Sequence, residues 1–189
     1  YVCKSSRISL LKTRFPDPAG FTKTMLNRGI RLNLWTNPYV SPDSPLFDQI
    51  DPFTASHTVW CGTVPDLNHP EAKKIFAGQL EKDQVSIGVS GYKLDEVDGY
   101  DYYLWPDMAT FPSGISGIQM RQTYDLLSQK LIEKLYRKES TRTLGLIRAS
   151  NARAYNLPFF IFNDYYSHPD FITALINRSF CGVLWKPEV

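Results

Sequence analysis

The most constraining feature of this 189-residue sequence is a repeated change in apolar periodicity, from short strand-like runs to helix-like stripes. Strands are predicted at 30–35, 86–94, 144–148, 159–162 and 182–185. Helices are predicted over 19–28, from Pro70 onward, over 117–138 and from Pro169 onward. No hairpin signal separates the strands, so helices must make the crossovers and the strands must run parallel. The sequence therefore predicts an α/β fold with a parallel sheet.

Such a sheet is either open and doubly wound or part of a barrel. An open nucleotide-binding sheet usually carries a glycine-rich phosphate loop, but the candidate GVSG at 88–91 has neither GxGxxG nor GxxxxGK spacing. The (β/α)8 TIM barrel is therefore favoured. Because a complete barrel needs about 250 residues, residues 1–189 are expected to form a single, incomplete barrel domain with five or six strands.

Composition argues against several kinds of partner and cofactor. Lys and Arg total 21 against 19 Asp and Glu, and these charges are scattered, so no nucleic-acid partner is expected. No apolar stretch approaches the ~20 residues that cross a bilayer, so no membrane partner is expected either. Three separated cysteines, and three histidines without HxxxH or HxH spacing, predict neither a metal site nor a cofactor. The first residue is Tyr1 and no signal peptide follows it, which favours a fragment of unknown localisation.

Catalytic groups in a parallel barrel sit at the carboxyl ends of its strands. The polar residues that follow the predicted strands are Asn37, Tyr39, Lys93, Asp95, Arg148, Asp164, Lys186 and Glu188. Carboxylates and cations around one rim can supply an acid, a base and a nucleophile.

Strand alternation places Lys93 and Asp95 on one face of the GYKLD segment, and Tyr92 and Leu94 on the helix-covered face. A cation beside a carboxylate favours its ionised form, as a nucleophile requires. A buried Lys–Asp pair that only fixes packing is an equally good interpretation of this segment alone. A calcium loop at Asp95, Glu96, Asp98 and Asp101 is disfavoured, because alternate-residue ligands would fall on Val97.

Asp164 ends the apolar segment PFFIFND and is followed by Tyr165. Apolar surroundings raise the pKa of a carboxyl group, which a general acid at neutral pH needs. The alternative is a helix cap, although Ser167 is better placed for that role. The sequence has no GxSxG elbow, and no cysteine directly follows a predicted strand, so neither a Ser nor a Cys hydrolase is indicated.

The tryptophans at positions 35, 60, 105 and 185 lie near strand ends or loops. An indole there can form a platform for a sugar ring, and Trp35 and Trp105 are candidate walls of such a site. Core packing is the commoner role of tryptophan, so about half of the four are expected in the core.

Across nearly its whole length the chain resembles the catalytic barrel of glycoside hydrolase family 31, the retaining α-glycosidases. The matching segments are FPDP at 15–18, LNRGIRLNLWTNPYV at 26–40, VPDLNHPEA at 64–72, GVSGYKLDEVDG at 88–99, FPSG at 111–114 and the stretch from Arg148 through Pro158 to NDYY at 163–166. Their order and spacing together carry the resemblance.

The resemblance implies a role for each matching position. Asp95 corresponds to the nucleophile, Asp164 to the acid/base and Arg148 to the arginine of the subsite that holds the cleaved sugar. Lys93, Trp35, Trp105 and Tyr165 are then expected to contact substrate. The implied substrate is an α-linked oligosaccharide or glycoconjugate. The implied partners are the remaining barrel strands and flanking β domains, since the chain matches about the third to the seventh strand.

Three positions depart from the family pattern. Asn163 replaces the common glycine before the acid/base, Arg121-Gln122 replaces a usual His-Asn before Tyr124, and Lys186-Pro187-Glu188 replaces a glycine pair. These changes argue against a plain α-glucosidase, and they leave open a non-catalytic or inactive carbohydrate-binding barrel fragment. The DEVDGYD segment at 95–101 and the WPDMATFPSG segment at 105–114 resemble the branch with α-N-acetylgalactosaminidase-like and α-galactosidase-like members.

Overall fold

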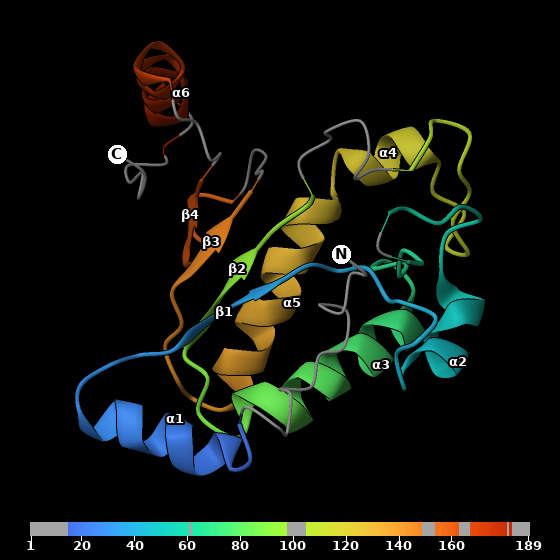
Figure 1. The fold of residues 1–189 in the computed structure, drawn as a ribbon. Coiled ribbons are helices and arrows are strands. Elements are labelled where there is room, and N and C mark those ends of the chain that lie inside the picture. Colours follow the sequence, from blue (N-terminus) through green and yellow to red (C-terminus); the bar gives the residue numbers. More distant parts are fainter. Residues whose placement is uncertain are drawn as a thin grey trace.

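A computed structural model describes residues 15–60, 62–97, 105–148, 154–162, 167–180 and 182. The strands in this part of the chain form one four-stranded sheet in the order β1-β2-β3-β4 (Figure 1). They are β1 (Asn33–Thr36), β2 (Gly91–Leu94), β3 (Gly145–Ile147) and β4 (Phe159–Ile161). Each neighbouring pair is parallel, which confirms the predicted parallel sheet with neighbours in chain order. The strand predicted at 182–185 lies, apart from Gly182, outside the described residues.

Helices lie between β1 and β2 and between β2 and β3, where they cover one face of the sheet, and further helices precede β1 and follow β4. They are α1 (Pro18–Asn27), α2 (Phe47–Ile50), the 3-10 helix η2 (Asp51–Phe53), α3 (Pro70–Leu80), the π-helical turn η3 (Glu81–Val85), α4 (Gly117–Arg121), α5 (Tyr124–Lys138) and α6 (His168–Phe180). Figure 1 shows α5 running along the sheet with α3 next to it, and α6 beyond the carboxyl end of β4. Arg178 of α6 is buried and donates a hydrogen bond to the Ile161 carbonyl of β4.

Local sequence accounts for several helix ends. The Asp17 carboxylate accepts a hydrogen bond from Gly20 N at 2.9 Å and Pro18 opens α1, which is a favoured helix start. Gly29, at φ 77°, allows the chain to leave α1 through a left-handed residue. Ser116 and Gln119 form a reciprocal capping box at the start of α4.

Some predicted boundaries were wrong. The strand expected over 86–94 begins only at Gly91, because α3 continues into the η3 turn and residues 86–88 also turn. The helix expected over 117–138 is two helices, interrupted at Gln122 and Thr123. The helix predicted from Pro70 onward does begin there, and its N-cap is His69, whose ring accepts a hydrogen bond from Glu71 N at 3.3 Å.

The hydrophobic core lies between the sheet and helices α3 and α5. Leu94 and Ile147 project from the strands, and Phe76, Leu80 and Ile132 meet them from the helices. Each of these five side chains is at most 6% exposed. Burying a side chain of this size contributes about 1.5–3 kcal/mol to folding.

Within the described part of the chain, no helix combines the length and the hydrophobicity needed to cross a membrane.

Candidate active site

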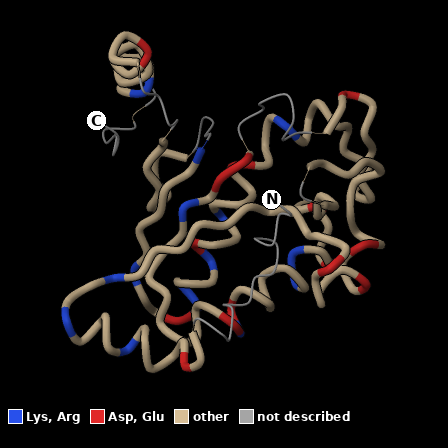
Figure 2. Tube along the Cα trace, viewed as in Figure 1, with Lys and Arg blue, Asp and Glu red and all other residues tan. Residues whose placement is uncertain are grey.

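The carboxyl ends of β1, β2 and β3 meet at one level of the sheet. Asp95, the first residue after β2, donates its backbone N–H to the Thr36 carbonyl at 2.9 Å. Arg148, the first residue after β3, donates its backbone N–H to the Leu94 carbonyl at 3.0 Å. Main-chain bonding between strands therefore places both side chains at the same edge, and Figure 2 shows the acidic end of β2 beside basic positions.

Four donors surround the Asp95 carboxylate. Oδ2 accepts the Trp35 indole N–H at 2.7 Å and lies 3.6 Å from Lys93 Nζ. Oδ1 accepts the Glu96 backbone N–H at 2.9 Å and an Arg148 Nη1 donor at 3.4 Å. Asp95 is only 5% exposed, and two cations and two neutral donors offset the cost of burying its charge.

The ring of Phe162 supports both cations. Lys93 Nζ lies 4.2 Å and Arg148 Cζ 5.5 Å from its centroid, within the range of cation–π attraction. Phe162 is 1% exposed, so the ring is a fixed surface against which the two charges rest. Sequence reasoning missed this role and treated Phe162 as the end of an apolar strand.

The face assignments made from strand alternation are confirmed. Lys93 and Asp95 contact each other on one face of β2, whereas Leu94 packs with core residues of α3 and α5 on the other. Trp35 is 41% exposed although its indole bonds the buried Asp95. The carboxylate therefore lies just beneath the surface and is not part of a sealed packing pair.

Two of the predicted rim residues support the site from behind. The Asn37 side-chain oxygen accepts the Tyr39 backbone N–H at 3.2 Å, and Tyr39 donates its hydroxyl to the Glu96 carbonyl. Both residues are almost fully buried, Asn37 at 4% and Tyr39 at 1% exposure. They fix the backbone around Asp95 instead of facing solvent.

The structure does not bring Trp105, an expected substrate wall, to this site. Trp105 is 1% exposed and donates its indole N–H to the Gly117 carbonyl at 2.8 Å. The rings of Phe111 and Tyr124 pack edge-on against it at centroid distances of 5.2 and 5.1 Å. With its donor satisfied and its faces covered, Trp105 is a core residue in the described chain, and its assignment as a wall is corrected.

The second half of the predicted site, Asp164 and Tyr165, lies outside the described residues. The same holds for Asn163 and for the segment 186–188. Among the residues that the structure does describe, no three His, Cys, Asp or Glu side chains gather to hold a metal ion. Asp98 and Asp101 of the disfavoured calcium loop are likewise outside the described part.

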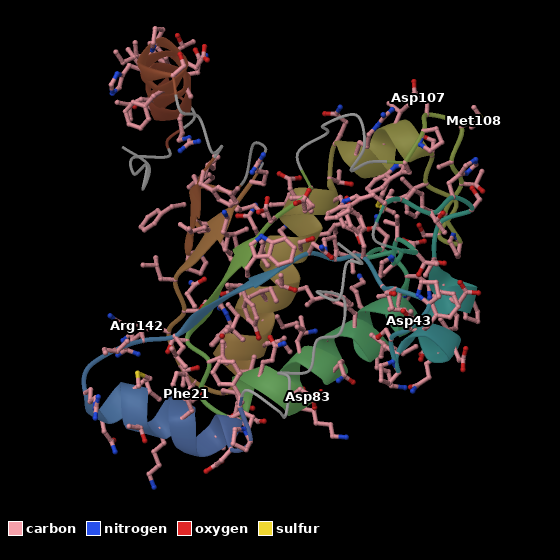
Figure 3. All side chains as sticks on the ribbon, in the orientation of Figure 1. Phe21, Asp43, Asp83, Asp107, Met108 and Arg142 are labelled. Carbon is pink, nitrogen blue, oxygen red and sulfur yellow. The ribbon has the colours of Figure 1, made fainter. Side chains whose placement is uncertain are left out.

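One departure from the family pattern can be placed. Arg121 ends α4 and forms an ion pair with Asp107, which Figure 3 shows at the corner of the molecule next to Met108. The Arg121 side chain is therefore engaged in holding the 105–116 loop to α4.

Buried tyrosines lie behind the sheet and near the loops. Burial, with Tyr136 nearby, raises the pKa of Tyr92 on β2. Burial also raises the pKa of Tyr136 and of Tyr124, and the neighbouring Tyr39 and Asp66 add to the effect at Tyr124. These hydroxyls stay protonated at neutral pH, and Tyr124 and Tyr136 donate to the carbonyls of Pro65 and Val89.

Comparison with known proteins identifies relatives of the chain. A family model described as the TIM-barrel domain of glycosyl hydrolases family 31 matches residues 2–186. An alpha-xylosidase of Emericella nidulans is 26% identical over 147 residues, covering 71% of this chain and 18% of the relative. The myogenesis-regulating glycosidase of Mus musculus is 28% identical over 111 residues, covering 52% of this chain and 15% of that protein.

Solved structures share the fold. An α-xylosidase from a soil metagenome, complexed with xylose, superposes with a TM-score of 0.82 at 16% identity, over 97% of this chain and 30% of that one. A family 31 sulfoquinovosidase from E. rectale, in complex with an aza-sugar inhibitor, superposes with a TM-score of 0.73 at 21% identity, over 85% of this chain and 26% of that one. With the family match, these structures confirm the predicted α/β TIM-barrel fragment. The chain spans less than a third of the length of each of these four proteins.

Proposed function

The chain belongs to glycoside hydrolase family 31, and we propose that it carries the catalytic carboxylates of a retaining glycosidase that cleaves α-linked oligosaccharides or glycoconjugates. Asp95 is the proposed nucleophile and Asp164 the proposed acid/base. The observation that carries the proposal is the environment of Asp95, a carboxylate at the carboxyl end of a barrel strand with four donors on its two oxygens. This is the end of the barrel at which TIM-barrel enzymes place their chemistry.

The proposed reaction has two displacements. An Asp95 oxygen attacks the anomeric carbon, a glycosyl ester forms, and Asp164 gives its proton to the departing glycosidic oxygen. Asp164 then takes a proton from water, the water oxygen attacks the anomeric carbon, and the Asp95 ester bond breaks. The anomeric centre is inverted twice, so its configuration is retained.

The cations next to Asp95 have proposed roles in binding and orientation. Arg148 and Lys93 both approach Asp95 and both rest on the Phe162 ring, so the two cations lie beside the proposed nucleophile. We expect the two cations to contact hydroxyl groups of the sugar that undergoes cleavage. The half-exposed ring of Trp35 lies beside them and provides an apolar face for the same sugar.

The test uses the full-length protein, because this chain covers only part of its relatives. A panel of nitrophenyl α-xylosides, α-glucosides, α-galactosides and α-N-acetylgalactosaminides would identify the sugar, since two of the matched proteins are named xylosidases and the sequence resembles a different branch. Asp95→Asn should lower kcat/KM by at least about a thousandfold, equivalent to about 4 kcal/mol of transition-state stabilisation. Asp164→Asn should lower it most for substrates with poor leaving groups.

The matched control is Asp43→Asn, which changes an exposed aspartate between β1 and α2. Figure 3 labels Asp43, which lies away from the carboxyl ends of the strands. Its kinetics should match those of the parent protein. NMR of the first product should show the α anomer before mutarotation. Turnover by Asp95→Asn at the parent's rate, or a β anomer as first product, would overturn the proposal.

The alternative is a carbohydrate-binding barrel without catalysis, which the replacement of the family glycine by Asn163 favours. This alternative predicts that the parent protein hydrolyses none of the panel. It also predicts that a sugar binds with the same affinity to the parent and to Asp95→Asn, which calorimetry would measure.

A further inference from the structure

We infer that Tyr39 is a positioning residue for Asp95 and that it acts through the backbone of Glu96. The inference rests on the proposed function, in which Asp95 attacks the sugar. It assigns a role in the reaction to a buried side chain on the β1 side of the sheet that bonds the backbone of Glu96, the residue next to Asp95.

Glu96 has an unusual backbone conformation directly after the nucleophile. Its φ is 65°, in the left-handed region that residues with a Cβ adopt at a cost of about 1 kcal/mol or more. Residues held in this region persist only where the surrounding structure imposes it, and such residues cluster at functional sites.

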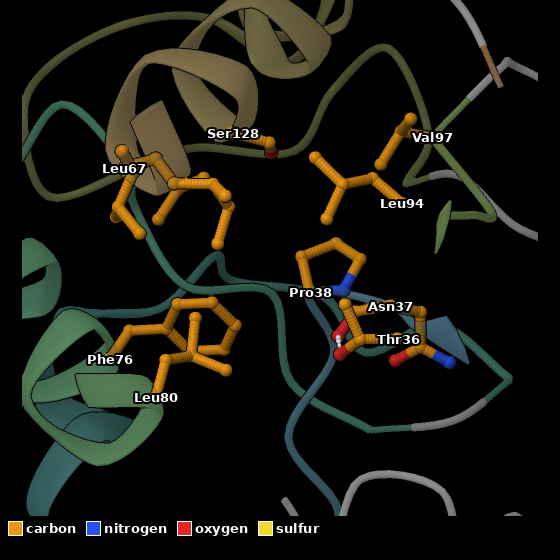
Figure 4. Close-up of a pocket in the computed structure, with 11 residues that line it drawn as sticks. Thr36, Asn37, Pro38, Leu67, Phe76, Leu80, Leu94, Val97 and Ser128 are labelled. Atoms are coloured by element: carbon orange, nitrogen blue, oxygen red, sulfur yellow. Dashed lines mark hydrogen bonds between the residues drawn. The ribbon is translucent and has the colours of Figure 1, made fainter. Parts of the chain in front are cut away.

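Contacts on both sides of Glu96 impose the turn. Leu94 and Val97 are 6% and 5% exposed, and both line the same apolar space against α3 and α5 (Figure 4). The chain must leave this layer at Asp95 and return to it within three residues. Tyr39 then fixes the direction of the turn, because its hydroxyl donates to the Glu96 carbonyl.

The turn delivers a hydrogen bond to the nucleophile. The Glu96 backbone N–H points at Asp95 Oδ1 at 2.9 Å, on the oxygen that Arg148 also approaches. This is the shortest contact that Oδ1 makes among those described, and it comes from a group without side-chain freedom. A change in the Glu96 backbone would therefore rotate the carboxylate away from the geometry that the attack requires.

Tyr39 presents its hydroxyl from a rigid frame. It is 1% exposed, and its own N–H donates to the Asn37 side chain at 3.2 Å. The next residue, Val40, exchanges two backbone hydrogen bonds of 2.9 Å with Thr63. The segment that follows β1 thus holds the turn that follows β2, and the tyrosine connects the two.

The first test is Tyr39→Phe in the full-length protein. The substitution removes the hydrogen bond from the Tyr39 hydroxyl to the Glu96 carbonyl. As a result kcat should fall about ten- to a hundredfold, the effect of misplacing the one hydrogen bond that Glu96 N–H donates to the charged Asp95 carboxylate. KM should change less than twofold, since the hydroxyl contacts no substrate in this scheme. The matched control is Tyr136→Phe, which removes another buried hydroxyl that donates to a backbone carbonyl, that of Val89 at 2.8 Å. Tyr136→Phe should lower the melting temperature by about as much as Tyr39→Phe does, but it should leave kcat unchanged.

The second test is a double-mutant cycle with Glu96→Gly. Glycine adopts positive φ without the penalty that a Cβ imposes, so the turn should depend less on Tyr39. Tyr39→Phe should therefore cost a smaller factor in kcat in the Glu96→Gly background than in the parent. The Glu96 side chain is present in both proteins of the parent pair and absent from both proteins of the glycine pair, so its own effect on kcat cancels within each pair.

The outcomes separate this inference from the proposed function. If Asp95→Asn is inactive while Tyr39→Phe behaves like Tyr136→Phe, or if the two changes in the cycle are additive, the positioning role is wrong and the nucleophile stands. If Asp95→Asn keeps the parent's turnover, the proposed function fails and the positioning role fails with it. A kcat loss in Tyr39→Phe that Glu96→Gly reduces would support the inference.

Discussion

Asp95 receives its donors from residues in or directly after three adjacent strands and from the backbone N–H of Glu96. Trp35 belongs to β1, Lys93 to β2, and Arg148 directly follows β3. An exposed ion pair contributes at most about 1 kcal/mol, but these groups converge on a carboxylate that is 5% exposed. Their convergence sets the orientation of both carboxylate oxygens of Asp95. A small displacement of any of the three strands would therefore move a donor away from this carboxylate.

At this scale the indole of Trp35 gives a direct prediction. Trp35→Phe keeps an aromatic ring but removes the N–H that donates to Asp95 Oδ2 at 2.7 Å. A hydrogen bond to a charged group contributes about 1.5–3 kcal/mol, so kcat/KM should fall about ten- to a hundredfold. Steady-state kinetics of the full-length protein measure this effect.

The control for this change is Trp60→Phe. Trp60 is 47% exposed in the turn between Val59 and Gly62, and its substitution should leave kcat/KM within twofold of the parent. Equal kinetics for Trp35→Phe and Trp60→Phe would mean that the indole N–H does not support the nucleophile.

Much of the site could be predicted from strand ends alone. Lys93, Asp95 and Arg148 come together because parallel strands present their carboxyl ends at one edge. The indole bond of Trp35 and the ring of Phe162 beneath both cations could not be predicted, because neither follows from a position in a strand. They depend on side-chain directions that only the packed sheet determines.

At the scale of elements, the close approach of β2 and β3 is the feature that aligns Asp95 with Arg148. A Cβ added to Gly91 would lie 2.1 Å from the Leu144 carbonyl oxygen, which is backbone and cannot move away cheaply. The residue must therefore be glycine for β2 to lie this close to the segment that enters β3.

Gly91→Ala is accordingly expected to push β2 away from β3. The melting temperature should fall by several degrees and kcat/KM should fall with it, because the site spans both strands. Gly78→Ala is the matched control, since its added Cβ has no atom within 4 Å and it lies inside α3. There alanine should stabilise the helix by about 0.5–1 kcal/mol. Thermal unfolding with parallel activity assays checks both, and a Gly91→Ala protein as stable and active as the parent would contradict the account.

Element order was predictable, but element boundaries were not. Apolar runs indicated each described strand, and helical stripes indicated α3 between β1 and β2 and α5 between β2 and β3. The break between α4 and α5 at Gln122 and Thr123 escaped, because Met120, Tyr124 and Leu131 still follow a helical stripe across it. The η3 turn escaped for a related reason, since a π-helical continuation of α3 leaves no clear sequence signal.

For the molecule as a whole, buried tyrosines predict how stability depends on alkaline pH. Burial raises the pKa of Tyr92, Tyr124 and Tyr136, so the folded state keeps their protons to higher pH than the unfolded state does. Their contribution is therefore complete below the unfolded value of about 10 and is lost as the pH rises above it, by at most about 1.4 kcal/mol per pH unit for each group.

Tyrosinate absorbance at alkaline pH, compared between folded and urea-unfolded full-length protein, measures this behaviour. Tyr124→Phe should reduce by one the number of tyrosines that ionise only on unfolding. An unchanged number would mean that Tyr124 titrates in the folded protein and that its hydroxyl is not held on the Pro65 carbonyl.

The family and the barrel could be predicted from the whole sequence because the resemblance extends over nearly all of it, and the family match covers residues 2–186. The pairing of Asp95 with Asp164 stays a prediction, since position 164 lies outside the described residues. The retaining mechanism requires the two carboxyl groups to be about 5–5.5 Å apart.

The most direct measurement is to trap the proposed ester on the full-length protein. A 5-fluoro glycosyl fluoride of the preferred sugar retains a good leaving group, while its ring fluorine slows both displacements, so the first product should accumulate. Peptide mass spectrometry should then find the added sugar on Asp95, and Asp95→Asn should acquire none. A sugar attached to another carboxylate, or hydrolysis without any attached sugar in a protein that yields the β anomer, would contradict the assignment of Asp95 as the nucleophile.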